Sequence, residues 1–384
     1  MRLVSLLEFT SEQDAFVEAI RDFARRECGT REQQLALTRD FTEGHNADVY
    51  SHFAELGWLG VSISEIYGGS GGGAVGGCLL LEETARGMVP ISGYGTTIIV
   101  ASAYEQFGTE EQKRMVLGEI TQGSVEAISM SEPNAGSDVA RLACRAEKVD
   151  GGFLVNGQKT WCSHAHFSKR ILLLARTSVD DDPHHGITML SVPADAEGLE
   201  MSRIATMGYP ETNDLFFTDC LVPEASVLGE VDLGWSQLVA GLNVERLAIA
   251  AGALGLAERA FDDTVAYVKV RQQFGRPIGR FQALQHRLAD LATEIECCRL
   301  LVYAVAAAVD RDPQRLLPRE ASMAKLKATE TAKQVALEGL QMMGGYGYSR
   351  EYDMERYVRT ALMLPIFGGT SEIQRNIVAS TFGL

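Results

Sequence analysis

The chain has 384 residues, of which 46% are hydrophobic and 22% are charged, ordinary values for a globular protein of two or three domains. Its formal net charge is −16, from 35 basic and 51 acidic side chains, which argues against nucleic acid or an anionic membrane as the main partner. The seven cysteines include no CxxC pair, so we expect a reducing compartment, the cytoplasm.

Residues 1–122 are predicted to form a helical domain. Phe16, Ile20 and Phe23 follow helical spacing, and Ser11 with Asp14 resembles a capping box. Because this pattern begins within about ten residues of the first, we expect no signal or transit peptide. The candidate helices are 11–27, 46–56, 77–86 and 110–120.

The hydrophobic period changes to two in the next part of the chain, residues 123–231. This alternation predicts a small antiparallel β domain between two helical blocks. Asn156-Gly157 is a strong hairpin-turn signal. The candidate strands are 170–176, 186–192 and 214–217.

Residues 232–384 are predicted to be helical again and to form a four-helix bundle, because long helical patterns alternate with short Gly- and Pro-containing breaks. The predicted fold class is therefore α+β, mostly α. No apolar run approaches the ~20 residues that span a bilayer, so no membrane span is expected. The candidate helices are 235–271, 281–309, 318–343 and 350–380.

The first of these helices carries a carboxylate within an apolar stripe. Leu242, Glu245, Ile249 and Gly252 recur at steps of three and four and so share one helix face. Arg246 is adjacent and does not face Glu245. A carboxylate in such a stripe needs a partner, a ligand or a proton. Two interpretations stay open at this point: a buried ion pair with a distant arginine, and a general base whose pKa is raised by burial.

Four motifs follow one another along the chain. They are MSEPNAGSD at 130–138, GQKTWCS at 157–163, RQQFG with IGRFQ at 271–275 and 278–282, and QMMGGYG with GGTSEIQR at 341–347 and 368–375. In this order and at these separations, they resemble the acyl-CoA dehydrogenase family of flavoenzymes, over essentially the whole chain. The resemblance implies FAD as the cofactor.

The resemblance also implies which residues hold the flavin ring. Residues matching Met130 and Ser131 contact the ring, the match to Trp161 packs against it, and the match to Ser163 bonds near N5 to tune hydride acceptance. Ser137 matches a residue at the pyrophosphate or thioester end. The alternative for Trp161, taken alone, is a core aromatic of the β domain.

The ADP half of FAD would be held by residues from another subunit. Arginine suits a pyrophosphate because its fork can bond two oxygens; the alternative for Arg271 is a solvated cation at a helix end. Glu372 stands where other members often have Gln. The residues that match this part of the family site are Arg271, Gln273, Phe274, Gln341 and Gly345, and Thr370 and Glu372 match residues that contact FAD near its ribityl and adenosine parts.

The family reaction removes the α-proton of an acyl thioester while the β-hydrogen leaves as hydride to flavin N5. Many members carry the base where this chain has Gly368, which cannot accept a proton. A branch resembling isovaleryl-CoA and long-chain dehydrogenases carries it on the bundle helix as Glu-Arg, which Glu245-Arg246 matches. Glu245 is thus the predicted base. The Gly368 backbone N–H would polarise the thioester carbonyl.

Substrate contacts are predicted at Ser137, Asn243 and Arg246 by the same resemblance. It implies oxidation of an acyl-CoA to the trans-2-enoyl-CoA, with electrons passing to electron-transfer flavoprotein, by a homotetramer or dimer of dimers. Relatives commonly have Arg near Pro210, in the loop 207–212, which lies toward the acyl-CoA site. His164 and His166 lack an acidic cluster, so no metal site is expected.

Two other functions remain open on this fold. One is a flavin monooxygenase or oxidase, which would let the flavin meet O₂. The other is a subunit of a heteromeric dehydrogenase that acts on a bulky acyl group, such as a steroid, or on a carrier-bound acyl group.

Overall fold

The computed structural model describes residues 7–313 and 315–383, and every side chain among them except that of Ala240. The chain divides into two compact units. Unit 1 comprises residues 1–34, 74–89 and 246–384, and unit 2 comprises 35–73 and 90–245. The predicted three-domain division stays a prediction; its ends at residues 1–6 and 384, and residue 314, lie outside the described part.

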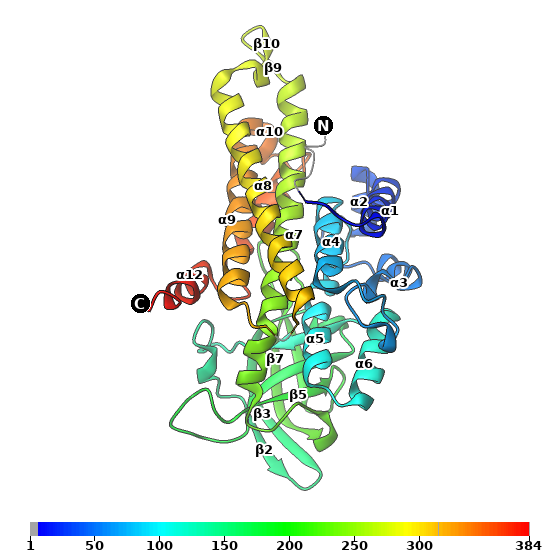
Figure 1. Ribbon diagram of the computed structural model, residues 1–384, viewed down its shortest axis with the longest axis vertical. Coiled ribbons are helices and arrows are strands. Elements are labelled where there is room, and N and C mark those ends of the chain that lie inside the picture. Colours follow the sequence, from blue (N-terminus) through cyan, green and yellow to red (C-terminus); the bar gives the residue numbers. More distant parts are fainter. Residues whose placement is uncertain (1–6, 314, 384) are drawn as a thin grey trace. The chain divides into compact units, whose positions relative to one another are not determined.

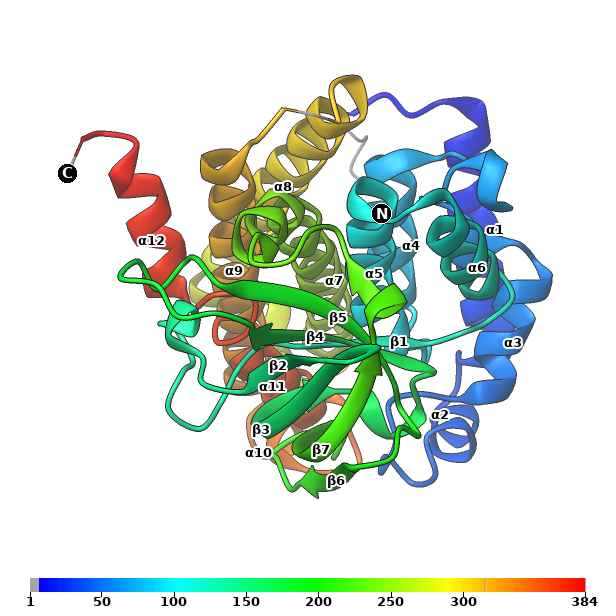
Figure 2. The ribbon, with the colours of Figure 1, turned by 90° about the horizontal axis from the view of Figure 1, so that it is seen from below.

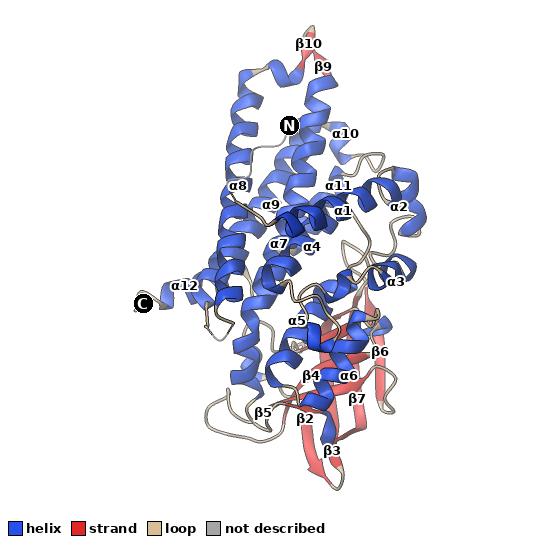
Figure 3. Ribbon diagram, turned by 45° about the vertical axis from the view of Figure 1, so that its right-hand side comes forward, coloured by secondary structure: helices blue, strands red, loops and turns tan. Residues whose placement is uncertain are grey.

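Unit 1 is helical. Helices α7, α8 and α9 lie side by side in Figure 1, and the β9–β10 hairpin joins α7 to α8. Blue marks all helices in Figure 3. The elements are α1 (Ser11–Glu27), α4 (Gly73–Arg86), the larger part of α7 (Gly234–Val270), β9 (Gln272–Gln273), β10 (Arg276–Pro277), α8 (Gln282–Arg311), α9 (Pro318–Met343), α10 (Gly345–Tyr348), α11 (Met354–Met363) and α12 (Ser371–Ser380), with α2 (Arg31–Leu37) crossing from unit 1 into unit 2.

The core of unit 1 is built on α7, which is apolar on most of its surface. Ala250, Leu254 and Ala257 of α7 are at most 1% exposed and pack with Val302 of α8 and Ala328 of α9. An 18-residue window of α7 reaches a mean hydropathy of 1.4, enough in length and composition to cross a membrane. The prediction that no apolar run approaches that length is therefore wrong. However, 71% of the window is buried inside the protein, as in a core helix.

Two details of the predicted helices are wrong. The capping box of α1 lies one residue earlier than predicted, because the Thr10 side chain accepts from the Gln13 N–H and the Gln13 side chain accepts from the Thr10 N–H. The predicted helix 350–380 is two helices, α11 and α12. The break contains Gly368 and Gly369, whose φ values of 62° and 80° leave the helical region and favour glycine.

Unit 2 combines helices with one large sheet, drawn red in Figure 3. The strand order is β6-β7-β3-β2-β4-β5-β8, with β1 beside β4 (Figure 2). Pairing is antiparallel, except that β4 pairs in parallel with β1 and β2. The elements are α3 (Ala47–Glu55), α5 (Gly93–Phe107), α6 (Glu110–Thr121), β1 (Glu126–Ser129), β2 (Arg145–Val149), β3 (Gly152–Ser163), β4 (Arg170–Arg176), β5 (Ile187–Pro193), β6 (Leu199–Ile204), β7 (Thr212–Pro223) and β8 (Val227–Leu228).

Strand β4 explains why this sheet is stable. Leu172 and Leu174 pack into a core with helices α5 and α6, while Ile171 and Leu173 face a second core formed with β3 and β7. A strand buried on both faces needs a continuous apolar run, which 171–175 provides. The predicted β domain is confirmed, as is the mostly helical α+β class.

The predicted hairpin turn at Asn156-Gly157 is wrong. Both residues lie inside strand β3, where the register against β7 shifts between Val155 and Gly157. The φ of Gly157 is 146°, and a Cβ there would lie 2.8 Å from the Cα of Cys144. Glycine is therefore required by a β-bulge and a close backbone approach. The turn before β3 lies at residues 150–151 instead.

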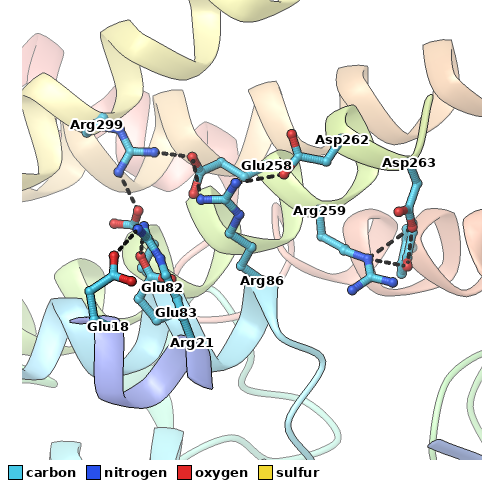
Figure 4. A network of polar contacts seen from close by, with 11 residues as sticks. Glu18, Arg21, Glu82, Glu83, Arg86, Glu258, Arg259, Asp262, Asp263 and Arg299 are labelled. Atoms are coloured by element: carbon cyan, nitrogen blue, oxygen red, sulfur yellow. Dashed lines mark hydrogen bonds and ion pairs between the residues drawn. The ribbon is translucent and has the colours of Figure 1, made fainter. Parts of the chain in front are cut away.

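A network of charged side chains ties α1, α4, α7 and α8 together within unit 1 (Figure 4). Arg21 donates to Glu83 at 2.7 and 2.5 Å, and Arg86 pairs with Asp262 at 2.7 Å. Arg299 donates to both Glu82 and Glu258. Three arginines thus face six carboxylates, which are those of Glu18, Glu82, Glu83, Glu258, Asp262 and Glu296.

This excess of negative charge favours a proton on the network. Burial raises the pKa of Glu258, and the neighbouring carboxylate of Glu82 raises it further, against Arg299 and Arg86. A carboxyl whose pKa is raised in the folded state stabilises the fold fully below its unfolded pKa. That contribution is lost as the pH rises through the folded pKa.

We expect Glu258→Gln, which mimics the protonated form, to remove this pH dependence. As the pH rises from about 5 to about 9, the free energy of unfolding of the variant should increase relative to that of the wild type by on the order of 1–2 kcal/mol. Urea denaturation of both proteins at several pH values measures the difference. A difference that stays constant over this pH range would show that Glu258 is ionised in the folded state throughout.

Candidate active site

The end of strand β3 presents an aromatic ring at the surface. Trp161 is 60% exposed, and its φ is 60°, a conformation that is uncommon for a bulky residue. The register of β3 against β7 shifts between Lys159 and Cys162, so Trp161 lies in a bulge, a device that re-aims a side chain. The alternative of a core aromatic therefore does not hold. Strained, exposed residues of this kind cluster at ligand sites.

A buried ammonium group lies beneath the segment that contains Met130 and Ser131. The Nζ of Lys159, whose side chain is 0% exposed, donates to the Met130 carbonyl at 2.9 Å and to Glu132 Oε1 at 2.8 Å. Glu132 also accepts from the backbone N–H groups of Ala143 and Cys144 at 2.7 and 2.8 Å. A buried charge is tolerated when it is paired and hydrogen-bonded in this way.

This network joins two of the predicted ring-binding segments. The Thr160 N–H donates to the Ser131 carbonyl at 2.9 Å, so the segment after β1 is fixed to the strand that carries Trp161 and Ser163. Met130, Ser131 and Ser163 are half-buried, and Ser137 is exposed. The sequence analysis missed Lys159 and Glu132, although both stand inside motifs that it named.

A second cluster of predicted residues lines a groove in unit 1. The cavity has a volume of about 700 Å³, and Arg271, Gln273, Phe274 and Gly345 are among its lining residues. The Arg271 guanidinium lies 5.3 Å from the ring centroid of Tyr346, a cation–π distance. Phe274 is 93% exposed with a φ of 53°. The groove offers a cation, aromatic faces and glycine backbone together. The predicted residue Gln341 is exposed but does not line this groove.

The loop before α12 holds the remaining predicted residues of the C-terminal motif. The carbonyl of Gly369 accepts from Lys325 Nζ at 2.9 Å, and that of Gly368 accepts from the Gln374 side chain at 2.9 Å. Thr370 caps α12 by accepting from the Ile373 N–H. Glu372 is exposed in the first helical turn. Buried Lys325 and Gln374 thus fix the loop, and the sequence analysis assigned neither a role.

The carboxylate of α7 is buried, as its apolar stripe predicts. Glu245 is 6% exposed, and Asn243 and Arg246 are 6% and 7% exposed. Few ionisable side chains are buried to this extent without a structural or chemical role. In the part of the chain that the structure describes, no three or more His, Cys, Asp or Glu residues group as metal ligands would.

The three family models that match the chain cover nearly all of it. Residues 10–124 match the N-terminal domain of acyl-CoA dehydrogenases, 127–220 the middle domain, and 232–382 the C-terminal domain. The chain belongs to the acyl-CoA dehydrogenase family. It is therefore an oxidoreductase of a flavoprotein family, and the resemblance seen in the motifs is confirmed.

Similar proteins cover the chain from end to end. It is 35% identical to mitochondrial isovaleryl-CoA dehydrogenase of Solanum tuberosum, over 97% of this chain and 90% of that protein. It is 36% identical to mitochondrial 2-methylacyl-CoA dehydrogenase of the same plant, with the same coverage. The butyryl-CoA dehydrogenase structure of Megasphaera elsdenii is 31% identical, has a TM-score of 0.90, and is matched over 98% of this chain and 100% of that one.

Proposed function

We propose that the protein is an FAD-dependent dehydrogenase that oxidises a short, branched acyl-CoA to its 2-enoyl-CoA, with Glu245 as the base. The observation that carries this proposal is which of the two possible positions of the base holds a carboxylate. Glu245 is buried at 6% exposure in the long helix α7, and the alternative position for a base holds Gly368, with a φ of 62°. Electron-transfer flavoprotein is the acceptor that we propose.

The residues present fit FAD. Exposed Trp161, in its strained bulge, offers an apolar face to a flat ring, and Met130, Ser131 and Ser163 lie on segments bonded to the same strand. Arg271 and the glycine-lined groove suit a pyrophosphate and an adenosine. When bound, FAD would supply the hydride acceptor. A groove so exposed in one chain is consistent with cofactor sharing between subunits, so we propose a homotetramer or dimer of dimers.

Glu245 would accept the α-proton. Glu245 is 6% exposed on α7, so its carboxyl is largely shielded from bulk water. Efficient proton transfer also needs a fixed geometry, and a helix holds a side chain more rigidly than a loop does. Asn243 and Arg246, buried one turn or less away, would orient the CoA end of the substrate together with Ser137.

The Gly368 N–H would polarise the thioester carbonyl. The adjacent loop is held by Lys325 and Gln374, so a backbone donor there would be preorganised, which is what stabilisation of developing negative charge requires. The absence of a side chain at this position would also leave space beside the reacting carbons. That space, and the two branched-chain relatives, support a methyl-branched acyl group.

Glu245→Gln keeps the shape of the side chain and removes proton acceptance. Turnover of the best acyl-CoA should fall at least ~10²-fold, the lower range for a positioned base, while FAD content and oligomeric state stay unchanged. Steady-state kinetics with a dye acceptor and size-exclusion chromatography measure both. Turnover within a few-fold of the wild type would mean that another group is the base.

Arg271→Ala removes the charge-assisted contact that we place on the pyrophosphate. Because such bonds contribute about 1.5–3 kcal/mol, the variant should purify with less FAD and as a weaker oligomer, and added FAD should restore both. Arg280→Ala, which changes a cation outside the groove lining, is the matched control. If the Arg271 variant retains all its FAD, this arginine is only a solvated helix end.

The acyl preference can be measured with matched substrates. We expect kcat/KM for isovaleryl-CoA or 2-methylbutyryl-CoA to exceed that for the linear chain of equal length by about tenfold or more, because one methyl group of fit is worth ~1–3 kcal/mol. Gly368→Ala should narrow the difference by filling the space. A wild-type enzyme that prefers the linear chain by tenfold would contradict the branched-chain assignment.

A further inference from the structure

Unit 2 holds a half-buried carboxylate, that of Glu211, which the proposed reaction does not use. Glu211 stands in the loop before β7, and its side chain is 12% exposed. The Glu211 Oε1 accepts from the Gly44 N–H at 2.8 Å and from the Ser92 hydroxyl at 3.0 Å. Its Oε2 lies 3.4 Å from Nε2 of His164, so one carboxylate joins three separate segments.

Glu211 holds the residue that follows Ser163. The His164 N–H donates to the Glu211 carbonyl at 2.7 Å, and the His164 ring is held from its other side by Thr96, whose Oγ1 lies 3.1 Å from Nδ1. The φ of His164 is 65°, in the left-handed region. A residue other than glycine keeps that conformation only when its surroundings enforce it.

The position of Ser163 depends on that turn. Ser163 is the last residue of β3 and pairs with Thr212, which follows Glu211 on β7. Glu211 and Thr212, which are consecutive in the chain, therefore fix His164 and Ser163 by backbone and side chain together. Just upstream lies the bulge of Trp161, which leaves this end of β3 with an interrupted ladder and a greater need for support.

The charges agree with this support. Burial alone would raise the pKa of Glu211, but hydrogen bonds from His164, Ser92 and Gly44 and the charge of His164 hold it below its ordinary value. Glu211 is therefore an anion that accepts from all its neighbours. Burial and His164 together lower the pKa of the nearby His45 to about 4, against Glu211, so His45 is neutral and does not compete for the carboxylate.

We propose that Glu211 is a positioning residue, which locks the left-handed turn at His164 and so fixes Ser163 against the flavin ring. This inference rests on the proposed function, because it assigns Ser163 to that ring. The bland alternative is that Glu211 only stabilises the fold. The two differ in whether the effect of Glu211 passes through Ser163.

Gly44 offers an independent way to move the carboxylate. A Cβ at Gly44 would lie 2.9 Å from Glu211 Oε1 and 2.9 Å from the Tyr209 ring, so Gly44→Ala must displace the flexible end of Glu211. The substitution changes neither Ser163 nor His164. Ser92→Ala is the matched control, because it removes one bond of the same carboxylate on the side away from the turn.

The test is a double-mutant cycle between Glu211→Gln and Ser163→Ala in the FAD-loaded enzyme. The readouts are the rate of flavin bleaching by an acyl-CoA without oxygen, the midpoint potential and visible spectrum of bound FAD, and the Kd for FAD. A displacement of about 1 Å can cost up to ~10²-fold in rate. We expect Glu211→Gln and Gly44→Ala to lower the bleaching rate by about tenfold or more. Both should alter the spectrum and midpoint potential of bound FAD, with a nearly unchanged Kd for FAD.

In the Ser163→Ala background, Glu211→Gln should lower the bleaching rate by less than about a further twofold. Ser92→Ala should leave the spectrum of bound FAD as in the wild type. Additive losses, or lowered thermal stability with an unchanged spectrum and potential, would overturn the inference. A wild-type protein that binds no FAD, or whose FAD no acyl-CoA bleaches, would instead reject the proposed function itself.

Discussion

The burial of helix α7 is the constraint on which this account rests. The middle of the 37-residue helix α7 is apolar on most of its surface and is buried, and the cores of both units include residues from the helix. A carboxylate placed in such a helix is expensive unless it is partnered or used. Since α7 is fixed by hydrophobic packing, the helix can hold Glu245 in one place, as a proton acceptor requires.

The sheet end of unit 2 shows how local strain is supported elsewhere. The bulge at Trp161, the left-handed turn at His164 and the segment after β1 are irregular backbone, and charged side chains hold the last two. Lys159 fixes the segment with Met130, and Glu211 fixes the turn. Irregular backbone of this kind persists only where its surroundings enforce it. The charged side chains and the exposed ring therefore belong to one structural unit.

Hydrophobic periodicity predicted the helices and strands that are fixed by packing. It failed where the backbone conformation of single residues determines the local structure. The limits of α1, α9 and β4 agree with the predicted ranges, because their hydrophobic spacing is regular. Asn156-Gly157 has the composition of a turn, but its glycine is used for a bulge beside Cys144. Helix α5 was missed because its start is rich in glycine and its apolar residues cover most of its surface.

The candidate site was predictable to the extent that motifs name residue types. The motifs named Trp161 and Arg271. The strained, exposed conformation of Trp161 and the groove around Arg271 could be found only from the structure. Lys159, Lys325 and Glu211 could not be found from spacing, because each acts through partners far away in the sequence, such as Met130, Gly369 and Gly44.

The role of Glu245 as the base can be measured apart from redox chemistry. An acyl-CoA analogue with sulfur in place of the β-carbon has no β-hydrogen to lose, so exchange of its α-protons in D₂O reports proton abstraction alone. The account predicts exchange by the FAD-loaded wild type and exchange at least ~10²-fold slower with Glu245→Gln, at equal binding of the analogue. Equal exchange rates in the two proteins would contradict it.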